Sequence, residues 1–189
     1  MTSVILLLVL LGIIVSFVAY VIIIYNGLIN LKHNIDRSWS NIDVLLKQRY
    51  DELPKLVSVC EGYMKHEQEV LENVTRARSQ LDQASTGPET LDANSAITSA
   101  LRSLFAVVEN YPDLKADRAF RQLQSRISQL EDQIADRREL YNSSVNIFNI
   151  RIEQFPDIFV ANGMNLTPRP LWQIDPGHRE DVSIRFSRA

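Results

Sequence analysis

The chain has 189 residues and a mass of 21.6 kDa, of which 46% are hydrophobic and 23% charged. This length holds a short membrane segment plus one domain, and it excludes two large domains. Lys+Arg 20 against Asp+Glu 23 give a formal net charge of -3, which excludes a general electrostatic attraction to nucleic acid. Cys60 is the single cysteine, so an intramolecular disulfide framework and a cysteine-rich zinc site are excluded as well.

The first feature along the chain is an uncharged apolar run between Val4 and Ile24, VILLLVLLGIIVSFVAYVIII. As a helix this run is about 31 Å long, close to the bilayer hydrocarbon core of about 30 Å. A cleaved secretory signal fits less well, because no basic region precedes the run, the run is too long, and no small-x-small site follows it. We therefore predict a transmembrane anchor over residues 1–25 that contacts the lipid bilayer.

The distribution of basic residues around this run predicts its orientation. No Lys or Arg precedes Lys32, whereas Arg37, Lys47 and Arg49 follow on the C-terminal side. Because positive charge prefers the cytoplasmic side, we expect the large C-terminal part in the cytoplasm and a very short N-terminal tail outside.

Beyond the anchor, hydrophobic residues recur every three or four positions, which is typical of amphipathic helices. The first stripe is Leu28, Leu31, Ile35, Trp39, Ile42, Leu46 and Leu53, and Pro54 then marks a kink or a new helix start. The second stripe is Leu56, Val59, Tyr63, Val70, Val74, Ala77, Leu81 and Ala84. It ends at the loop signal STGP, residues 85–88.

Two further stripes complete the pattern. The third is Ile97, Leu101, Leu104, Val108 and Tyr111, with Asn94 or Asp92 as a candidate cap and Pro112 as its interruption. The fourth is Phe120, Leu123, Ile127, Leu130, Ile134, Tyr141, Val145, Phe148, Ile152 and Phe155. Asp113 stands where an N-cap is expected, and Pro156 is the predicted stop.

Each stripe covers one face only, so each helix must bury that face against the others. The predicted fold is therefore all-α: a transmembrane helix, then an antiparallel four-helix bundle of long helices over residues 26–156. Prolines and glycines punctuate the remainder, and VSIRF at residues 182–186 alternates as an extended segment does. Residues 157–189 are accordingly expected to form an irregular, extended C-terminal tail.

A search for chemistry finds little. His33, His66 and His178 lie in three different segments, none with a zinc-ligand spacing. Neither a Gly-rich phosphate loop nor a G-x-S-x-G or H-E-x-x-H motif occurs. Cys60 neighbours the second stripe, which favours a buried core residue over a nucleophile. We therefore expect no catalytic residue, no cofactor, no metal and no small-molecule substrate.

Two arginines, Arg49 and Arg137, fall on otherwise apolar positions of their stripes. A buried guanidinium needs a carboxylate partner, for which Asp51, Asp43 or Glu109 are candidates. The pattern favours an ion pair that fixes the register of a bundle over a contact with a partner or ligand.

Several short strings, in order after a membrane span, resemble the bacterial LemA family. They are YNGLINL at residues 25–31, SWSNIDV at 38–44, KQRYDELP at 47–54, GYMKHE at 62–67 and YPDLKA at 111–116. Tyr141, Asn142, Val145, Phe148, Asn149, Ile152, Phe155 and Pro156 follow. The resemblance covers nearly the whole chain, and it departs most at LWQI, residues 171–174, where the family usually has an aromatic-acidic run.

The resemblance implies a membrane-anchored four-helix bundle in the bacterial inner membrane, crossing it once, with a cytoplasmic C-terminal domain. It does not imply an enzymatic activity, because none is established for the family, and a family relative associated with magnetosome membranes points to membrane organisation. Its structural or interaction candidates in this chain are Tyr25, Asn26, Trp39, Asn41, Asp43, Arg49, Tyr50, Pro54, Tyr111, Pro112, Tyr141 and Asn142.

The functional hypothesis is a non-enzymatic, membrane-anchored interaction or scaffold protein, acting in membrane organisation or signalling assemblies. Self-association by coiled packing, or binding to membrane-protein partners, is its expected form. The alternative is a membrane-bound enzyme or a ligand- or metal-sensing bundle, with a cavity between helices lined by Arg49, Arg137 and carboxylates.

Overall fold

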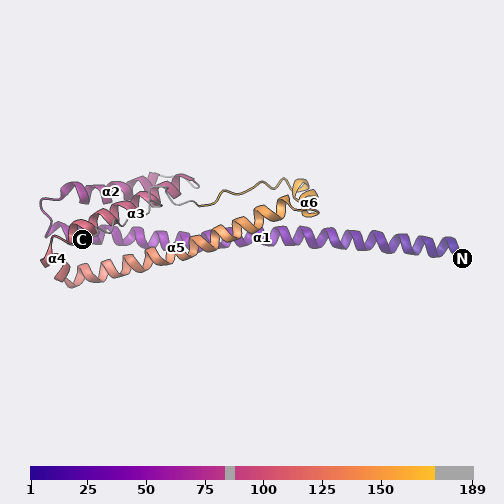
Figure 1. Ribbon diagram of the computed structural model, residues 1–189, viewed down its shortest axis with the longest axis horizontal. Helices are drawn as coiled ribbons and strands as arrows, with labels where there is room; N and C mark the ends of the chain where they lie inside the picture. The colour runs from indigo at the N-terminus through magenta and orange to yellow at the C-terminus, as the bar shows by residue number, and fades with distance from the viewer. Residues whose placement is uncertain (84–87, 173–189) are drawn as a thin grey trace, which may run out of the picture. The chain divides into compact units, whose positions relative to one another are not determined.

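The computed structural model describes residues 1–83 and 88–172, and this part of the chain contains helices and no strand (Figure 1). The helices are α1 (Thr2–Glu61), α2 (Gln68–Gln83), α3 (Pro88–Val108), α4 (Pro112–Ala116), α5 (Arg118–Glu153) and α6 (Asp157–Gly163). The predicted all-helical class is confirmed for the described residues. The predicted extended segment at 182–186 lies outside them.

The chain divides into two compact units. Unit 1 comprises residues 1–43 and 136–171, and unit 2 comprises residues 44–135 together with Trp172 among the described residues. The helices α1 and α5 each contribute one part to unit 1 and another to unit 2. Each unit has its own group of buried hydrophobic residues.

The first part of α1 is long and apolar enough to cross a membrane. Its large side chains face outward: Leu6 is 70% exposed and Ile23 is 67% exposed. Burial begins at Ile24, which is 5% exposed and belongs to the core of unit 1. The predicted apolar run therefore ends where packing against the rest of the chain begins.

Of the two predicted alternatives for Pro54, a kink or a new helix start, the new helix start is wrong, because α1 continues to Glu61. Pro54 is exposed, so water can hydrogen-bond the backbone carbonyl that loses its N–H partner there. Leu56 and Cys60 keep the buried face of the helix going beyond the proline. The second predicted stripe is therefore split between the end of α1 and α2.

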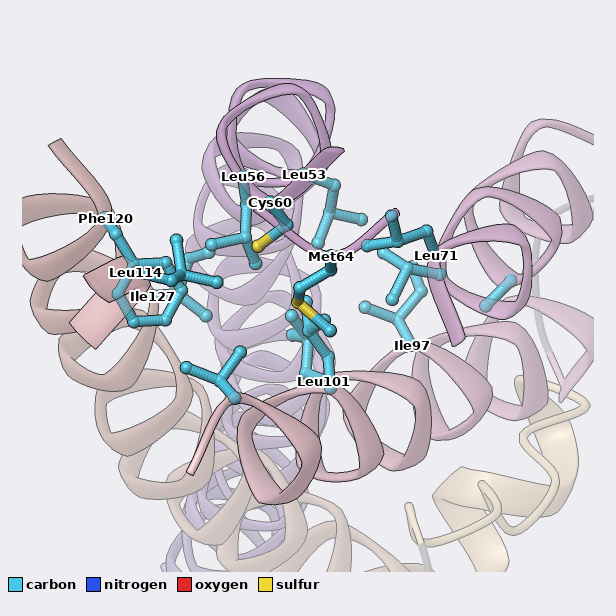
Figure 2. Packing of buried hydrophobic residues seen from close by; sticks show 14 residues of the cluster. Leu53, Leu56, Cys60, Met64, Leu71, Ile97, Leu101, Leu114, Phe120 and Ile127 are labelled. Atoms are coloured by element: carbon cyan, nitrogen blue, oxygen red, sulfur yellow. The ribbon is translucent and has the colours of Figure 1, made fainter. Parts of the chain in front are cut away.

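The core of unit 2 draws side chains from α1, α2, α3, α4 and α5, and α2 lies beside α3 (Figures 1 and 2). Its fully buried members include Leu53, Leu56, Leu104 and Phe120. Figure 2 shows Cys60 and Met64 with their sulfur atoms among these side chains. Burial of this kind is the main stabilising contribution available to amphipathic helices.

Cys60 is fully buried, and this burial raises the pKa of its thiol to about 12. Thiolate is the reactive form, so at pH 8 we expect the folded protein to react with a maleimide on the order of a thousandfold more slowly than a free thiol does. Reaction in denaturant should be complete. The measurement is mass spectrometry of the protein after timed exposure, and equal rates in the two states would contradict the burial of Cys60.

The core of unit 1 is smaller and joins α1, α5 and α6. Its buried members are Ile24, Leu28 and Ile35 from α1, Val145, Phe148 and Ile152 from α5, and Ala161 from α6. The tail was expected to be irregular from residue 157, but residues 157–163 form α6. Ala161 packs into this core and gives the short helix a buried face, whereas residues 165–172 are not helical, as predicted.

The predicted helix caps are also revised. Asp113 lies in the first turn of α4, and the backbone N–H of Phe120 donates to Oδ1 of Asp117 at 2.9 Å, which makes Asp117 the cap of α5. Asn94 lies within α3, which begins at Pro88, and its side chain is buried. The role of Asn94 is therefore set by the hydrogen bonds that its buried side chain makes inside the core.

The cap residue Asp117 predicts a specific acid sensitivity. The N–H of Phe120 holds the pKa of this carboxyl below its ordinary value. A lowered pKa means that Asp117 stabilises the fold above its unfolded pKa of about 3.9, and that this contribution is lost as pH falls through the folded value. In Asp117→Asn, which keeps an oxygen acceptor but does not titrate, we expect a smaller loss of thermal midpoint on acidification than in the wild type. Parallel curves of midpoint against pH for the two proteins would contradict this assignment.

Candidate functional site

The most unusual feature of unit 2 is a charged residue in its interior. Arg49 is 1% exposed, and it comes from the face of α1 that also carries Leu46 and Leu53. Its Nη1 donates to Oε1 of Glu131 at 2.5 Å and to Oγ1 of Thr98 at 2.9 Å. Its Nη2 donates to Oδ1 of Asn94 at 2.7 Å. Three helices, α1, α3 and α5, thus meet at one guanidinium.

The acceptors of Arg49 are themselves held in place. The hydroxyl of Thr98 donates to Oε2 of Glu131 at 3.1 Å, and the amide of Asn94 donates to the backbone carbonyl of Thr90 at 2.7 Å. The Nε atom of Arg49 is buried without a hydrogen-bond partner. We call Arg49, Asn94, Thr98 and Glu131 the Arg49 cluster.

The predicted ion pair for Arg49 is confirmed, but its named partners are wrong. Asp51 pairs with Lys47 at 2.6 Å, and Glu109 pairs with Lys115 at 2.5 Å, both at the surface, while Asp43 is exposed. The true partner, Glu131, is 82 residues away in sequence. Which carboxylate pairs with Arg49 depends on the register between α1 and α5.

The companion prediction for Arg137 is wrong, because Arg137 is exposed. The apolar stripe of α5 passes from Ile134 to Tyr141, and Arg138 rather than Arg137 is half-buried between them. A seven-residue step in a stripe does not itself reveal which intervening residue faces inward.

Sequence reasoning missed Glu52, a second buried charge one turn after Arg49. Its carboxylate accepts from Nζ of Lys55 at 3.0 Å and from Nε of Arg126 at 2.8 Å. The available signal was its position three residues after Arg49, which places both side chains on one face of α1. A second α1–α5 ion pair therefore accompanies the Arg49 cluster.

Two of the strings that carry the family resemblance meet in unit 2. The hydroxyl of Tyr63, in the turn after α1, donates to Oδ2 of Asp117 at 3.1 Å. The hydroxyl of Tyr111, beside Pro112 at the start of α4, donates to Oε1 of Glu67 at 3.0 Å. The bond to Asp117 raises the pKa of Tyr63, and burial together with the bond to Glu67 raises the pKa of Tyr111.

Other candidate residues form pairs at half-buried or exposed positions. In unit 1, the rings of Trp39 and Tyr141 lie 5.6 Å apart between centroids, at 59°. In unit 2, the hydroxyl of Tyr50 donates to Oδ1 of Asp82 at 2.6 Å, and the guanidinium of Arg78 lies 4.1 Å from the centre of the Tyr50 ring. Hydrogen bonding to Asp82 raises the pKa of Tyr50, and burial raises that of Tyr141.

The remaining candidates are not brought together into one site. Asn142 is half-buried in unit 1, and Tyr25 is 46% exposed. Four more are exposed at separate places: Asn26, Asn41, Asp43 and Pro54. The twelve candidates therefore divide between core, ring contacts and surface.

Chemically, the Arg49 cluster is suited to holding helices together. Arginine stays protonated in proteins, so Arg49 offers no general base, and its carboxylate partner is committed to it. Within residues 1–83 and 88–172, no group of three or more His, Cys, Asp or Glu residues is placed to hold a metal ion. Among the described residues of unit 2, one surface groove lies along the start of α5 and another lies beside α2, and Arg49 lines neither of these grooves.

The comparisons with known proteins agree with the resemblance seen in the sequence. The model of the LemA family matches residues 38–186. Protein LemA of Metamycoplasma hominis is 32% identical over 160 residues, covering 83% of this chain and 72% of its own. Magnetosome protein MamQ 2 of Paramagnetospirillum magneticum is 23% identical over 174 residues, covering 78% of this chain. Magnetosome protein MamQ of Magnetospirillum gryphiswaldense is 21% identical over 173 residues.

This chain spans 64% of the length of each of these two magnetosome proteins. The family match, by contrast, covers most of the chain. It includes Trp39 and Arg49 of α1 and the whole of α2 to α6. The chain belongs to the LemA family.

Proposed function

We propose that this protein is a non-enzymatic helical scaffold tethered to the bacterial inner membrane. In this proposal α1 crosses the bilayer once between Val4 and Ile24, and the C-terminal part lies in the cytoplasm. The part of α1 beyond the span and the helices that follow it form an antiparallel four-helix bundle that binds other copies of the chain or membrane-protein partners.

The observation that carries the proposal is the dual role of α1. Its first part exposes large apolar side chains, as a membrane span does, and its later part supplies buried residues to the cores of both units. Because the membrane span and the core residues belong to one continuous helix, α1 holds the folded part of the chain at a fixed place relative to the bilayer. The Arg49 cluster supports the same role, because its polar groups are used to join α1, α3 and α5.

The magnetosome relatives, by their names, suggest what such a scaffold would serve. We extend the proposal to the organisation of a membrane assembly, in which the protein contributes binding surfaces rather than chemistry.

The test is chemical crosslinking in native membranes followed by mass spectrometry, with an unrelated single-pass membrane protein as the control for random collisions. The proposal expects repeated protein contacts, with this chain itself or with a partner, that the control lacks. Recovery of only detergent and lipid would contradict it.

A pair of variants sharpens the test for self-association. Ile147 is 51% exposed on α5, and its neighbour Asn146 is also exposed. If copies meet through this face, Ile147→Glu should weaken crosslinking between copies severalfold while Asn146→Glu leaves it unchanged. Equal crosslinking in the two variants would exclude this face as the contact.

A further inference from the structure

Two phenylalanines lie exposed where α5 ends and α6 begins. Phe155 is 76% exposed and Phe159 is 69% exposed. Their rings contact each other edge to face, with centroids 5.9 Å apart at 84°. Two aromatic rings displayed together are costly in water, and aromatic side chains are enriched where a protein meets the bilayer interface.

Two contacts between α1 and α5 within unit 1 show which part of α1 lies beside the two phenylalanines. Trp39 contacts Tyr141, and a Cβ added at Gly27 would lie 3.9 Å from Nη2 of Arg151. Residue numbers on α5 therefore rise as those on α1 fall. α5 ends at Glu153, two residues past Arg151, so the turn that carries Phe155 follows the end of α5 that lies nearer the start of α1.

The hydrophobic core of unit 1 independently places the two phenylalanines beside the same part of α1. Ile24, the last residue of the apolar run, packs in one cluster with Ile152 and Ala161, which flank the two phenylalanines in sequence. Tyr25, 46% exposed, follows directly on α1. The exposed aromatic pair thus lies beside the point where α1 leaves the proposed membrane span.

We propose that Phe155 and Phe159 form a second membrane contact, with both rings inserted at the boundary between lipid headgroups and acyl chains. This inference rests on the proposed function, since it requires α1 to span the bilayer. The occupant is the lipid surface, because Ile152 and Ala161, which flank the pair in sequence, share a core with Ile24 at the end of the exposed apolar surface of α1. Burial of the rings orients unit 1 against the bilayer.

The charges around the pair are compatible with this position. The carboxylate of Asp157, at the start of α6, is buried and paired with Nε of Arg151. The exposed polar side chains of the corner, Glu153, Gln154 and Asn162, remain in the hydrated headgroup layer.

The experiment places an environment-sensitive fluorophore on introduced cysteines of the full chain in phosphatidylcholine–phosphatidylglycerol vesicles. Quenchers are attached either to the headgroup or along the acyl chain. The reporter is Asn162→Cys on α6, which keeps both phenylalanines. Leu140→Cys is the matched control, because Leu140 is exposed on α5 but roughly 22 Å from Phe155 along the chain direction of the helix. Native Cys60 is buried and stays unlabelled.

We expect headgroup quenching of Asn162→Cys to exceed that of Leu140→Cys by about threefold or more, and Phe155→Ser with Phe159→Ser to reduce it to the Leu140→Cys level. Both phenylalanines are exposed, so circular dichroism should show the double variant folded. Equal quenching at the two positions, or quenching of Asn162→Cys that survives the double substitution, would overturn the proposal.

A third label separates this inference from the proposed function. Ser16→Cys lies inside the apolar run and should be quenched by acyl-chain quenchers in every variant. Quenching at Ser16 without quenching at Asn162 would refute the aromatic contact and leave the tether intact. No quenching at Ser16 would refute the tether and, with it, the aromatic contact.

Discussion

Replacing Glu131 with alanine is expected to destabilise unit 2 by about 3 kcal/mol, the low end for breaking a buried ion pair. The substitution leaves Arg49, 1% exposed, with neutral acceptors and no anion to offset its charge. The side chain of Glu131 is itself 27% exposed, which is why we expect the low end. For a chain of this size the thermal midpoint should fall by roughly 6–12 °C. Thermal unfolding of the detergent-solubilised full chain, followed by circular dichroism, measures it.

The control for this prediction is the double variant Arg49→Met with Glu131→Ala. Methionine fills much of the same volume without a charge, so the double variant should be more stable than Glu131→Ala alone. A double variant that is less stable than Glu131→Ala would show that the desolvated charge of Arg49 is not the source of the loss.

Replacing Leu104 with alanine is expected to cost about 3 kcal/mol, within the range of about 2–5 kcal/mol for buried leucines. Leu104 is fully buried in the core of unit 2, and truncation removes apolar contacts and leaves a cavity. Leu140→Ala is the matched control, because Leu140 is 53% exposed and should change stability by less than about 0.5 kcal/mol. Similar shifts in the thermal midpoints of the two variants would contradict the assignment of Leu104 to the core.

Helical periodicity predicted most of the buried positions because it is a local property. Leu28, Ile35, Ile42 and Leu53 are all buried, and the unexplained seven-residue step before Leu53 is filled by Arg49. Once a residue is known to lie on the buried face of a helix, its neighbours three and four positions away follow from the geometry of the helix.

Helix ends and polar partners were predicted poorly because they depend on packing between segments. Asn94 has the chemistry of a cap, but its side chain accepts a hydrogen bond from Arg49 in the core. Pro54 has the chemistry of a break, but it lies on the exposed face of a helix that burial on the other face keeps intact. The partnership of Arg49 with Glu131 requires the register of α1 against α5, which no local pattern contains.

The candidate site shows the same division. The position of Arg49 on an apolar stripe correctly predicted a buried ion pair. Glu52 was missed although it lies three residues after Arg49, and the contact of Tyr63 with Asp117 was not predicted. These interactions give residues of the family strings a structural role, because they join helices to one another. A purified chain that converted a substrate at a saturable rate would contradict the proposed scaffold role.

The proposed function requires that the apolar run of α1 anchors this molecule in a bilayer. The most direct test is extraction of native membranes with alkaline carbonate, which releases proteins held only at the surface, comparing the full chain with the variant Leu8→Arg and Leu11→Arg. Each arginine should oppose insertion by about 3 kcal/mol at the centre of a span. We predict that the unmodified chain stays in the membrane pellet and that the arginine variant is depleted from it. Release of the unmodified chain into the supernatant would contradict the account.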